Sequence, residues 1–450
     1  MERSEFIRRL FERAHAADPE AQCEAYFSQS SEFEAEQRQG ELVNYSVSEG
    51  GGLGLRVLTK GKLGYASTQI LDEEAVGQLV DGAMENAALV ESEDEQFIFP
   101  GSAQYPEVDP WNPAPEALDA AEKLRMARTL EALTLAQDPR IDQASGSVFY
   151  YGEALGLANT HGLNLSLRRN LLGGYVEAVA REGDRVNTGG KLFYAARRED
   201  LDLEAAAKAA AREALAGLAG APVPSGGYRV LLRNDMARTL LATFSGMFSA
   251  DNAQRGLSRL QGREGEVIAA PCVTLLDDPH LPGSAASAPF DGEGVATRKK
   301  AVVEAGRLNT LLHNLKTAAK QGVETTANAA RGGYGGPVGV APSNFYIAPG
   351  GDDFEAMLAR TGDGLLITEL QGMHAGANPI TGDFSLAAKG FRVQGGRIAG
   401  PVAQITVAGN FYDVLKDVEA VGADLDFSLP FGTSYGSPSL LVKKLSVAGE

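Results

Sequence analysis

The sequence contains few of the residues that form disulfides or bind metals. Its 450 residues include two cysteines, Cys23 and Cys272, one tryptophan and five histidines. Two cysteines this far apart do not make the disulfide framework of a small secreted protein. No run of 18 uncharged apolar residues occurs, and the charged N-terminus has no apolar signal core. From these absences we expect a cytoplasmic protein with no membrane span.

Positive charge is also scarce. Lys and Arg total 41 against 59 Asp and Glu, which gives a net charge of -18. Residues 1–100 hold 20 acidic and 8 basic side chains, a net of -12. An acidic surface repels phosphate groups at long range, so we expect no direct binding to nucleic acid or to an anionic membrane. The 44% hydrophobic content is typical of a globular protein.

The common catalytic motifs are missing as well. We find no phosphate-binding loop, no CxxC pair and no HExxH. No two histidines are spaced to bind a metal from one helix face; they are His15, His161, His280, His313 and His374. The acidic pairs Asp277-Asp278 and Asp352-Asp353 are typical of turns and helix caps, with a divalent-ion site as the alternative.

Glycine, in contrast, is abundant, and its 53 residues separate short alternating segments typical of β-hairpins. The first part of the chain predicts the order helix, strands, helix twice, which suggests a duplicated unit. The proline-rich stretch 100–115 separates the two copies and is predicted to lack regular structure. The predicted elements are helices 3–17 and 73–90, strands 23–27 and 42–47, a hairpin over 53–68 with its turn at Lys60-Gly61, then helix 115–136, strands within 143–197 and helix 202–218.

A second domain follows a short linker. Prolines and glycines cluster around 220–228, and beyond them short strands and glycine turns dominate, with a predicted helix at 353–360. The predicted fold class is therefore α+β with two domains. We place a duplicated α+β domain at 1–221, the linker at 222–227 and a β-rich domain at 228–450.

One segment concentrates polar side chains among glycines. Within residues 370–391 stand His374, Asn378, Thr381, Asp383 and Ser385. Such a stretch can bind the main chain of an extended ligand. Equally, it can form a tight hairpin in which Asn378 and Asp383 bond to nearby turn amides.

This segment is also part of a family resemblance. GANPITGDFSLAAKGF (376–391) and QGGRIAGPVAQITVAGN (394–410) resemble the signature of the TldD/PmbA family of metallopeptidase-complex subunits, also called modulators of DNA gyrase. Further similar segments stand in the family's order over nearly the whole chain: GLGLRVLTKGKLGYAST (52–68), PFDGEGVATRKKAVVEAGRL (289–308), NFYIAPG (344–350) and GSPSLLVKKLSVAG (436–449).

The resemblance distinguishes two branches. The TldD branch carries HExxxH, whose histidines bind zinc and whose glutamate is the general base. In this chain Ala242 and Thr243 stand where the first His and the Glu would be, and Met247 stands at the second His. The family's third ligand, a late cysteine, is missing too, because no cysteine follows Cys272. The chain therefore resembles the zinc-free PmbA, or TldE, branch.

That branch implies a non-catalytic subunit paired in the cytoplasm with a TldD-type zinc peptidase. The complex would degrade or process unfolded peptides, such as antitoxins and peptide-antibiotic precursors. We expect no catalytic residue, no metal and no cofactor in this chain, with zinc only in the partner. Self-association through the surface meant for the partner is also possible. Candidate residues of a substrate groove are Arg331, Asn344, His374, Asn378 and Asp383.

Two other functions stay open from the sequence. One is a client-binding protein that acts without a catalytic partner. The other is a metal-independent hydrolase using His374 with Asp383 and Ser385, although their close spacing on one hairpin disfavours a productive geometry.

Overall fold

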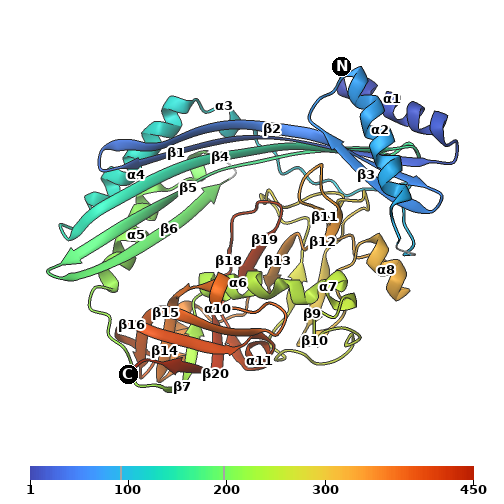
Figure 1. Cartoon of the computed structure of the whole chain (residues 1–450). Coiled ribbons are helices and arrows are strands. Elements are labelled where there is room, and N and C mark those ends of the chain that lie inside the picture. Colours follow the sequence, from blue (N-terminus) through green and yellow to red (C-terminus); the bar gives the residue numbers. More distant parts are fainter. Residues whose placement is uncertain (92–93, 196–197) are drawn as a thin grey trace.

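A computed structural model describes residues 1–91, 94–195 and 198–450 (Figure 1). Its N-terminal domain is one curved antiparallel sheet with strand order β3-β2-β1-β4-β5-β6. Helices cover its outer side, and the C-terminal domain lies under its concave side (Figure 1). The elements of this domain are α1 (Arg3–Ala17), β1 (Gln22–Arg38), β2 (Glu41–Thr59), β3 (Lys62–Thr68), α2 (Glu73–Ala88), α3 (Pro113–Ala117), α4 (Ala120–Leu135), β4 (Ile141–Asn159), β5 (Asn164–Glu182), β6 (Arg185–Ala195), η1 (Arg198–Asp200) and α5 (Leu203–Ala216).

The duplicated order predicted from the sequence is confirmed. The elements α1-β1-β2-β3-α2 recur as α4-β4-β5-β6-α5, and the first strands of the two copies, β1 and β4, pair at the centre of the sheet. Carboxylates cap α2, α4 and α5, because Asp72, Asp119 and Asp202 each accept a hydrogen bond from a first-turn backbone N–H. Lys60 and Gly61 both have positive φ and form the tight β2–β3 turn.

Three local expectations need correction. The strands predicted at 23–27 and 42–47 are parts of the much longer β1 and β2, since pairing along the full hairpin carries both strands through polar and glycine residues. The helix predicted at 115–136 is two helices, because Asp119 starts α4 as its N-cap. Part of the proline-rich stretch is helical, since Pro113 occupies the first turn of α3, where a missing N–H costs nothing.

The C-terminal domain has two six-stranded sheets, ordered β16-β15-β14-β7-β20-β17 and β10-β9-β8-β13-β19-β18, and a two-stranded sheet β11-β12. The predicted helix 353–360 is present as α9. The predicted linker 222–227 follows α5, but its last two residues, Gly226 and Gly227, already belong to β7. The strands are β7 (Gly226–Leu232), β8 (Leu275–Asp277), β9 (Lys300–Glu304), β10 (Arg307–Leu308), β11 (Ala329–Arg331), β12 (Val338–Val340), β13 (Asn344–Ile347), β14 (Gly364–Gln371), β15 (Asp383–Gln394), β16 (Arg397–Asn410), β17 (Val418–Val421), β18 (Asp426–Phe427), β19 (Ser434–Ser437) and β20 (Leu440–Ala448).

Helix α6 lies in the core of this domain. Its Phe244 stacks on Phe411 and contacts Phe384, and Phe248 just beyond it contacts Phe345 of the other sheet. The helical elements are α6 (Asn234–Phe244), η2 (Ser245–Phe248), α7 (Ala250–Gln254), α8 (Leu315–Gln321), α9 (Phe354–Thr361), α10 (Met373–Gly376) and α11 (Phe411–Lys416). Among the described residues, none of the helices combines the length and apolarity needed to cross a bilayer.

Candidate functional site

The three positions that correspond to the zinc motif lie at the end of α6 and in η2. Ala242 and Thr243 are partly exposed, while Met247 is buried in the core. The Thr243 hydroxyl donates a hydrogen bond of 2.8 Å to the carbonyl of Thr239 one turn earlier. Zinc in proteins is bound by imidazole, thiolate or carboxylate groups. A methyl group, a hydroxyl bonded to its own helix and a buried thioether do not fit zinc.

The rest of the described chain offers no alternative metal site. Over residues 1–91, 94–195 and 198–450, no three His, Cys, Asp or Glu side chains come together in a way that could hold a metal ion. Cys23 is buried, and burial raises the pKa of its thiol to about 12. Cys272 is exposed in a turn.

Two cavities lie where the domains meet. The larger one, of about 1070 Å³, is lined by β5, β6 and α5 on one side and by the start of α6 and β14–β16 on the other. Several of its charged groups are paired: Arg233 bonds to Asp235 and Glu213, Arg238 bonds to Asp426, and Lys389 lies 3.0 Å from Glu369. Five basic and six acidic side chains line the cavity in all, and this near balance favours a polar but nearly neutral ligand, such as a peptide main chain.

The smaller cavity, of about 480 Å³, is more apolar. Tyr26, Leu155 and Leu167 of the curved sheet line one side, and Phe290 and Phe431 of the C-terminal domain line the other. Residues of strands β11 and β12 also line it. This cavity can therefore accept an apolar side chain beside an exposed strand edge.

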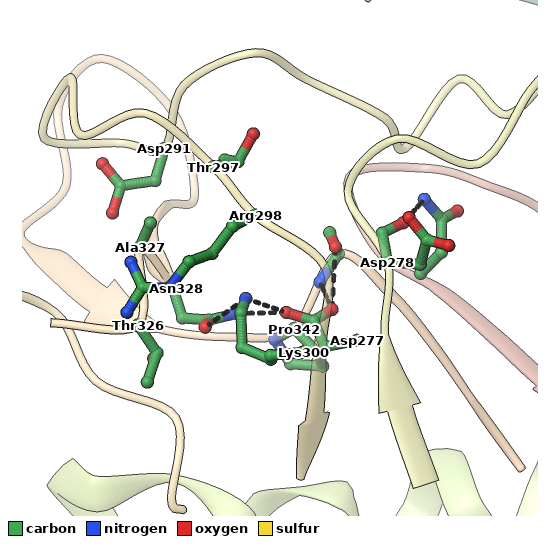
Figure 2. A network of polar contacts seen from close by, with 12 residues as sticks. Asp277, Asp278, Asp291, Thr297, Arg298, Lys300, Thr326, Ala327, Asn328 and Pro342 are labelled. Carbon is green, nitrogen blue, oxygen red and sulfur yellow. Dashed lines mark hydrogen bonds and ion pairs between the residues drawn. The ribbon is translucent and has the colours of Figure 1, made fainter. Parts of the chain in front are cut away.

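A polar network underlies this cavity (Figure 2). At its centre is the fully buried Asp277, one of whose oxygens accepts bonds from the Ser343 backbone N–H and hydroxyl at 2.8 and 2.7 Å. Its other oxygen accepts from Lys300 Nζ at 2.8 Å and from Asn328 Nδ2 at 2.7 Å. With four donors around it, this carboxylate positions its neighbours and is not free to act as a base.

Asp291 is a different kind of buried acid. Its carboxylate accepts bonds from the backbone N–H groups of Glu293, Val295 and Ala329, without a basic side chain. Burial, and then the nearby charge of Glu293, raise the pKa of Asp291 to about 7. The group therefore titrates near neutral pH.

The candidate Arg331 takes part in an ion cluster between the domains. Arg331 donates to Glu24 on β1 and, through Nε, to the Gly292 carbonyl at 2.6 Å. Arg56 on β2 bonds to the same Glu24 oxygen at 2.9 Å and lies 3.8 Å from Glu293. All four side chains are at most 5% exposed. We call Glu24, Arg56, Glu293 and Arg331 the interdomain ion cluster; it holds the two domains together.

Tyr334 makes a second contact between the domains. It lies in the glycine-rich loop between β11 and β12, and its hydroxyl accepts a 2.8 Å bond from Gln69. A Cβ added at Gly54 of β2 would lie 1.8 Å from the Tyr334 carbonyl oxygen, so only glycine allows this approach. The loop is therefore anchored against the curved sheet.

Asn344, the second candidate, is fully buried beside the network. Its amide donates to the Asp278 carbonyl at 2.7 Å and to Ser287, and its oxygen accepts from Ser284 at 2.6 Å. Asn344 therefore fixes the loops under the smaller cavity and is not among the residues that line it.

His374, Asn378 and Asp383 lie together in another place, the exposed turn 373–383. The Asn378 oxygen accepts from the backbone N–H of Ile380 and Thr381, and Asp383 accepts from Asn410 Nδ2 at 2.8 Å. Bonds from Asn410 and then Thr381 lower the pKa of Asp383. The tight-hairpin alternative holds for Asn378, which bonds to amides of its own turn, whereas Asp383 accepts its bond from Asn410, 27 positions later in the chain. His374, Asp383 and Ser385 make no hydrogen bond to one another within the described structure.

Sequence reasoning missed the buried charges. Glu24, Arg56, Asp291, Glu293 and Lys300 were not among the candidates, although three of them stand in the quoted segment 289–308. The available signal was DGEG, where two acids stand in an otherwise apolar and glycine-rich stretch. The expectation that the acidic pairs lie in turns or helix caps is confirmed for Asp353, which caps α9. It is wrong for Asp277, which is a core residue.

Family models match three consecutive parts of the chain. They describe PmbA/TldA metallopeptidase domain 1 at residues 23–87, the central domain at 113–218 and the C-terminal domain at 225–449. The Metalloprotease PmbA of Escherichia coli O157:H7 is 29% identical over 442 residues, covering 95% of this chain and 92% of that protein. A metalloprotease of Methanothermobacter thermautotrophicus is 27% identical over 433 residues, covering 92% of each chain.

Solved structures share the whole fold. A Thermotoga maritima protein described as a modulator of a DNA gyrase superposes with a TM-score of 0.90 at 36% identity, covering 99% of this chain and all of that one. TldE from Thermococcus kodakarensis superposes with a TM-score of 0.88 at 23% identity, covering 99% of this chain and 100% of that one, and supports the fold alone.

Proposed function

The chain belongs to the PmbA/TldD metallopeptidase family, and we propose that within it this chain is the zinc-free subunit of a cytoplasmic peptidase complex. Its function is of the family's peptidase type, as the names of its relatives indicate. The observation that carries the proposal is the donor set at the end of α6. Ala242, Thr243 and Met247 cannot hold zinc or supply a carboxylate base.

The chemistry then belongs to a TldD-type partner. Zinc bound there would supply a nucleophilic water near neutral pH. This chain would hold the substrate, an unfolded peptide such as an antitoxin or a peptide-antibiotic precursor, and keep it extended. It would need no cofactor of its own and would bind neither nucleic acid nor membrane.

The space between the domains supports binding of extended chains. Strand β12 pairs only with β11 among the described residues, so its other edge has main-chain groups available to a peptide strand. Gly339 and Val340 of this strand line the smaller cavity, next to Phe431. A peptide on this edge would direct alternate side chains into the apolar cavity.

A reconstitution experiment tests the proposal. We expect the purified chain to contain no stoichiometric zinc and to leave an unfolded casein peptide intact. Adding the TldD-type subunit from the same organism should give cleavage that is lost when the partner's motif glutamate is replaced by glutamine. Zinc-dependent cleavage by this chain alone would overturn the proposal. Tight peptide binding without any effect of the partner would favour the client-binding alternative.

A further inference from the structure

Part of β2 is an unpaired strand edge. β2 pairs with β1 along nearly its whole length, but β3 pairs with it only over residues 53–59. Residues 41–52 of β2 therefore present an edge that no other described strand covers. We call this stretch the open edge. Its outward N–H and C=O groups are a template for another strand.

Exposed apolar side chains accompany the open edge. Tyr45 and Val47 lie opposite Ala35 and Phe33 of β1, on the side of the sheet that carries the helices. They are nevertheless 50% and 61% exposed, and Leu42 nearby is 43% exposed. Helix α2 covers β2 and β3, and α4 covers β4 and β1, so neither helix shields this stretch (Figure 1). An apolar strip beside a free edge favours a protein contact.

The open edge also lacks the residues that block strand pairing. Its sequence, ELVNYSVSEGGG, contains no Lys, Arg or Pro. The strand at the opposite end of the sheet, β6, carries Arg185 and Lys191. Lysines and prolines on edges are the usual protection against unwanted pairing. Their absence here indicates that the open edge pairs with another strand.

The negative charge around the open edge indicates what kind of strand would pair with it. Residues 28–52 contain five acidic side chains and one basic one. On the concave side, the exposed Glu32 and Glu34 lie opposite Ser48 and Ser46, and neither forms an ion pair with the described residues. A second copy of this chain would bring the same glutamates and no basic side chain to the edge. A strand with Lys or Arg on one face would neutralise them.

We propose that the open edge of β2 docks a β-strand from a different protein, in which apolar side chains alternate with Lys or Arg. The apolar residues would cover Tyr45 and Val47. The basic residues would lie beside Ser46 and Ser48 on the concave side, and their long side chains would reach over these serines toward Glu32 and Glu34 of β1. The proposal is independent of the proposed function, because it concerns a different surface and stands whether or not this chain proves to be catalytic.

Designed strand peptides test it. The probe is a fluorescein-labelled ten-residue peptide of alternating valine and lysine, compared by anisotropy with a valine–glutamate peptide. We expect the lysine peptide to bind more tightly by on the order of tenfold at low salt. Replacing both apolar residues (Tyr45→Ser with Val47→Ser) should weaken binding by a similar factor. Val186→Ser, at an exposed apolar residue of β6, is the matched control and should change nothing.

Backbone pairing is tested separately from charge. N-methylation of every second residue removes the peptide N–H groups on one edge only, so one of the two methylation patterns should abolish binding and the other should not. The proposal is overturned if neither pattern matters, if both peptides bind equally, or if Tyr45→Ser with Val47→Ser binds as the Val186→Ser control does. A dimer of this chain that the double variant dissociates would also overturn it.

Discussion

The interdomain ion cluster and the turn 373–383 differ in how far apart in the sequence their bonded polar residues lie. In the cluster, Arg331 bonds to Glu24, which is 307 positions away in sequence, and all members are buried. In the turn, Asn378 and Asp383 bond to groups of the same hairpin region and remain exposed. Polar residues that are crowded in sequence here serve local structure, whereas scattered charges fix the arrangement of the domains.

The largest expected effect comes from breaking the cluster. Arg56→Ala would leave Glu24 and Glu293 buried without this partner, and we expect the free energy of unfolding to fall by about 3–5 kcal/mol. Arg8→Ala removes an exposed pair with Glu12 and should change it by about 0.5 kcal/mol or less. Urea denaturation of both variants measures the difference. Equal losses would show that the cluster contributes no more than a surface pair.

Asp291 adds a pH dependence beside the cluster. Its pKa is about 7 in the folded protein against 3.8 ordinarily. Between these values the folded chain keeps a proton that the unfolded chain has lost, so stability falls as pH rises from about 4 to about 7 and is level above that. The full difference corresponds to roughly 4 kcal/mol. Asp291→Asn should remove this part of the slope in urea denaturation at several pH values; an unchanged slope would contradict the assignment.

The contact of Tyr334 with β2 should have an intermediate effect. Gly54→Ala places a methyl group against the Tyr334 carbonyl, so we expect a loss of about 1–3 kcal/mol. Gly50→Ala in the same strand is the control, because its Cβ would meet only Ser30 Oγ at 3.6 Å. Thermal denaturation of both variants separates the steric clash with Tyr334 from the general effect of replacing a glycine. Equal melting temperatures for the two variants would show that the clash does not occur.

The smallest effects belong to the exposed turn. Asn378→Ala removes two bonds to turn amides and should cost about 1 kcal/mol. His374→Ala should change stability by about 0.5 kcal/mol or less and leave peptide cleavage by the reconstituted complex unchanged. A large loss of cleavage with His374→Ala, at unchanged stability, would show that this histidine takes part in the substrate site.

The sequence predicted much of the fold because its signals were local. Alternation, the helical spacing of apolar residues and the Lys60-Gly61 turn each act within a few residues, and the order of elements followed from them. The lengths of β1 and β2 were underestimated, since polar and glycine residues there are held in strands by pairing and not by propensity.

The candidate site was less predictable, because its contacts join residues that are distant in the sequence. The replacement of zinc ligands by Ala242, Thr243 and Met247 is visible in the sequence alone. The convergence of Glu24, Arg56 and Glu293 is not, because tertiary structure brings together residues that have no sequence spacing in common. Arg331 and Asn344 were identified from the family motif, but their buried bonds could be known only from the structure.

Native mass spectrometry of the complex purified from its own host can show whether the catalytic zinc belongs to the partner. We predict one zinc ion for each pair of unlike subunits, retained by the partner when the subunits are separated in the gas phase. Zinc retained by this chain after that separation would show that this subunit binds the metal itself.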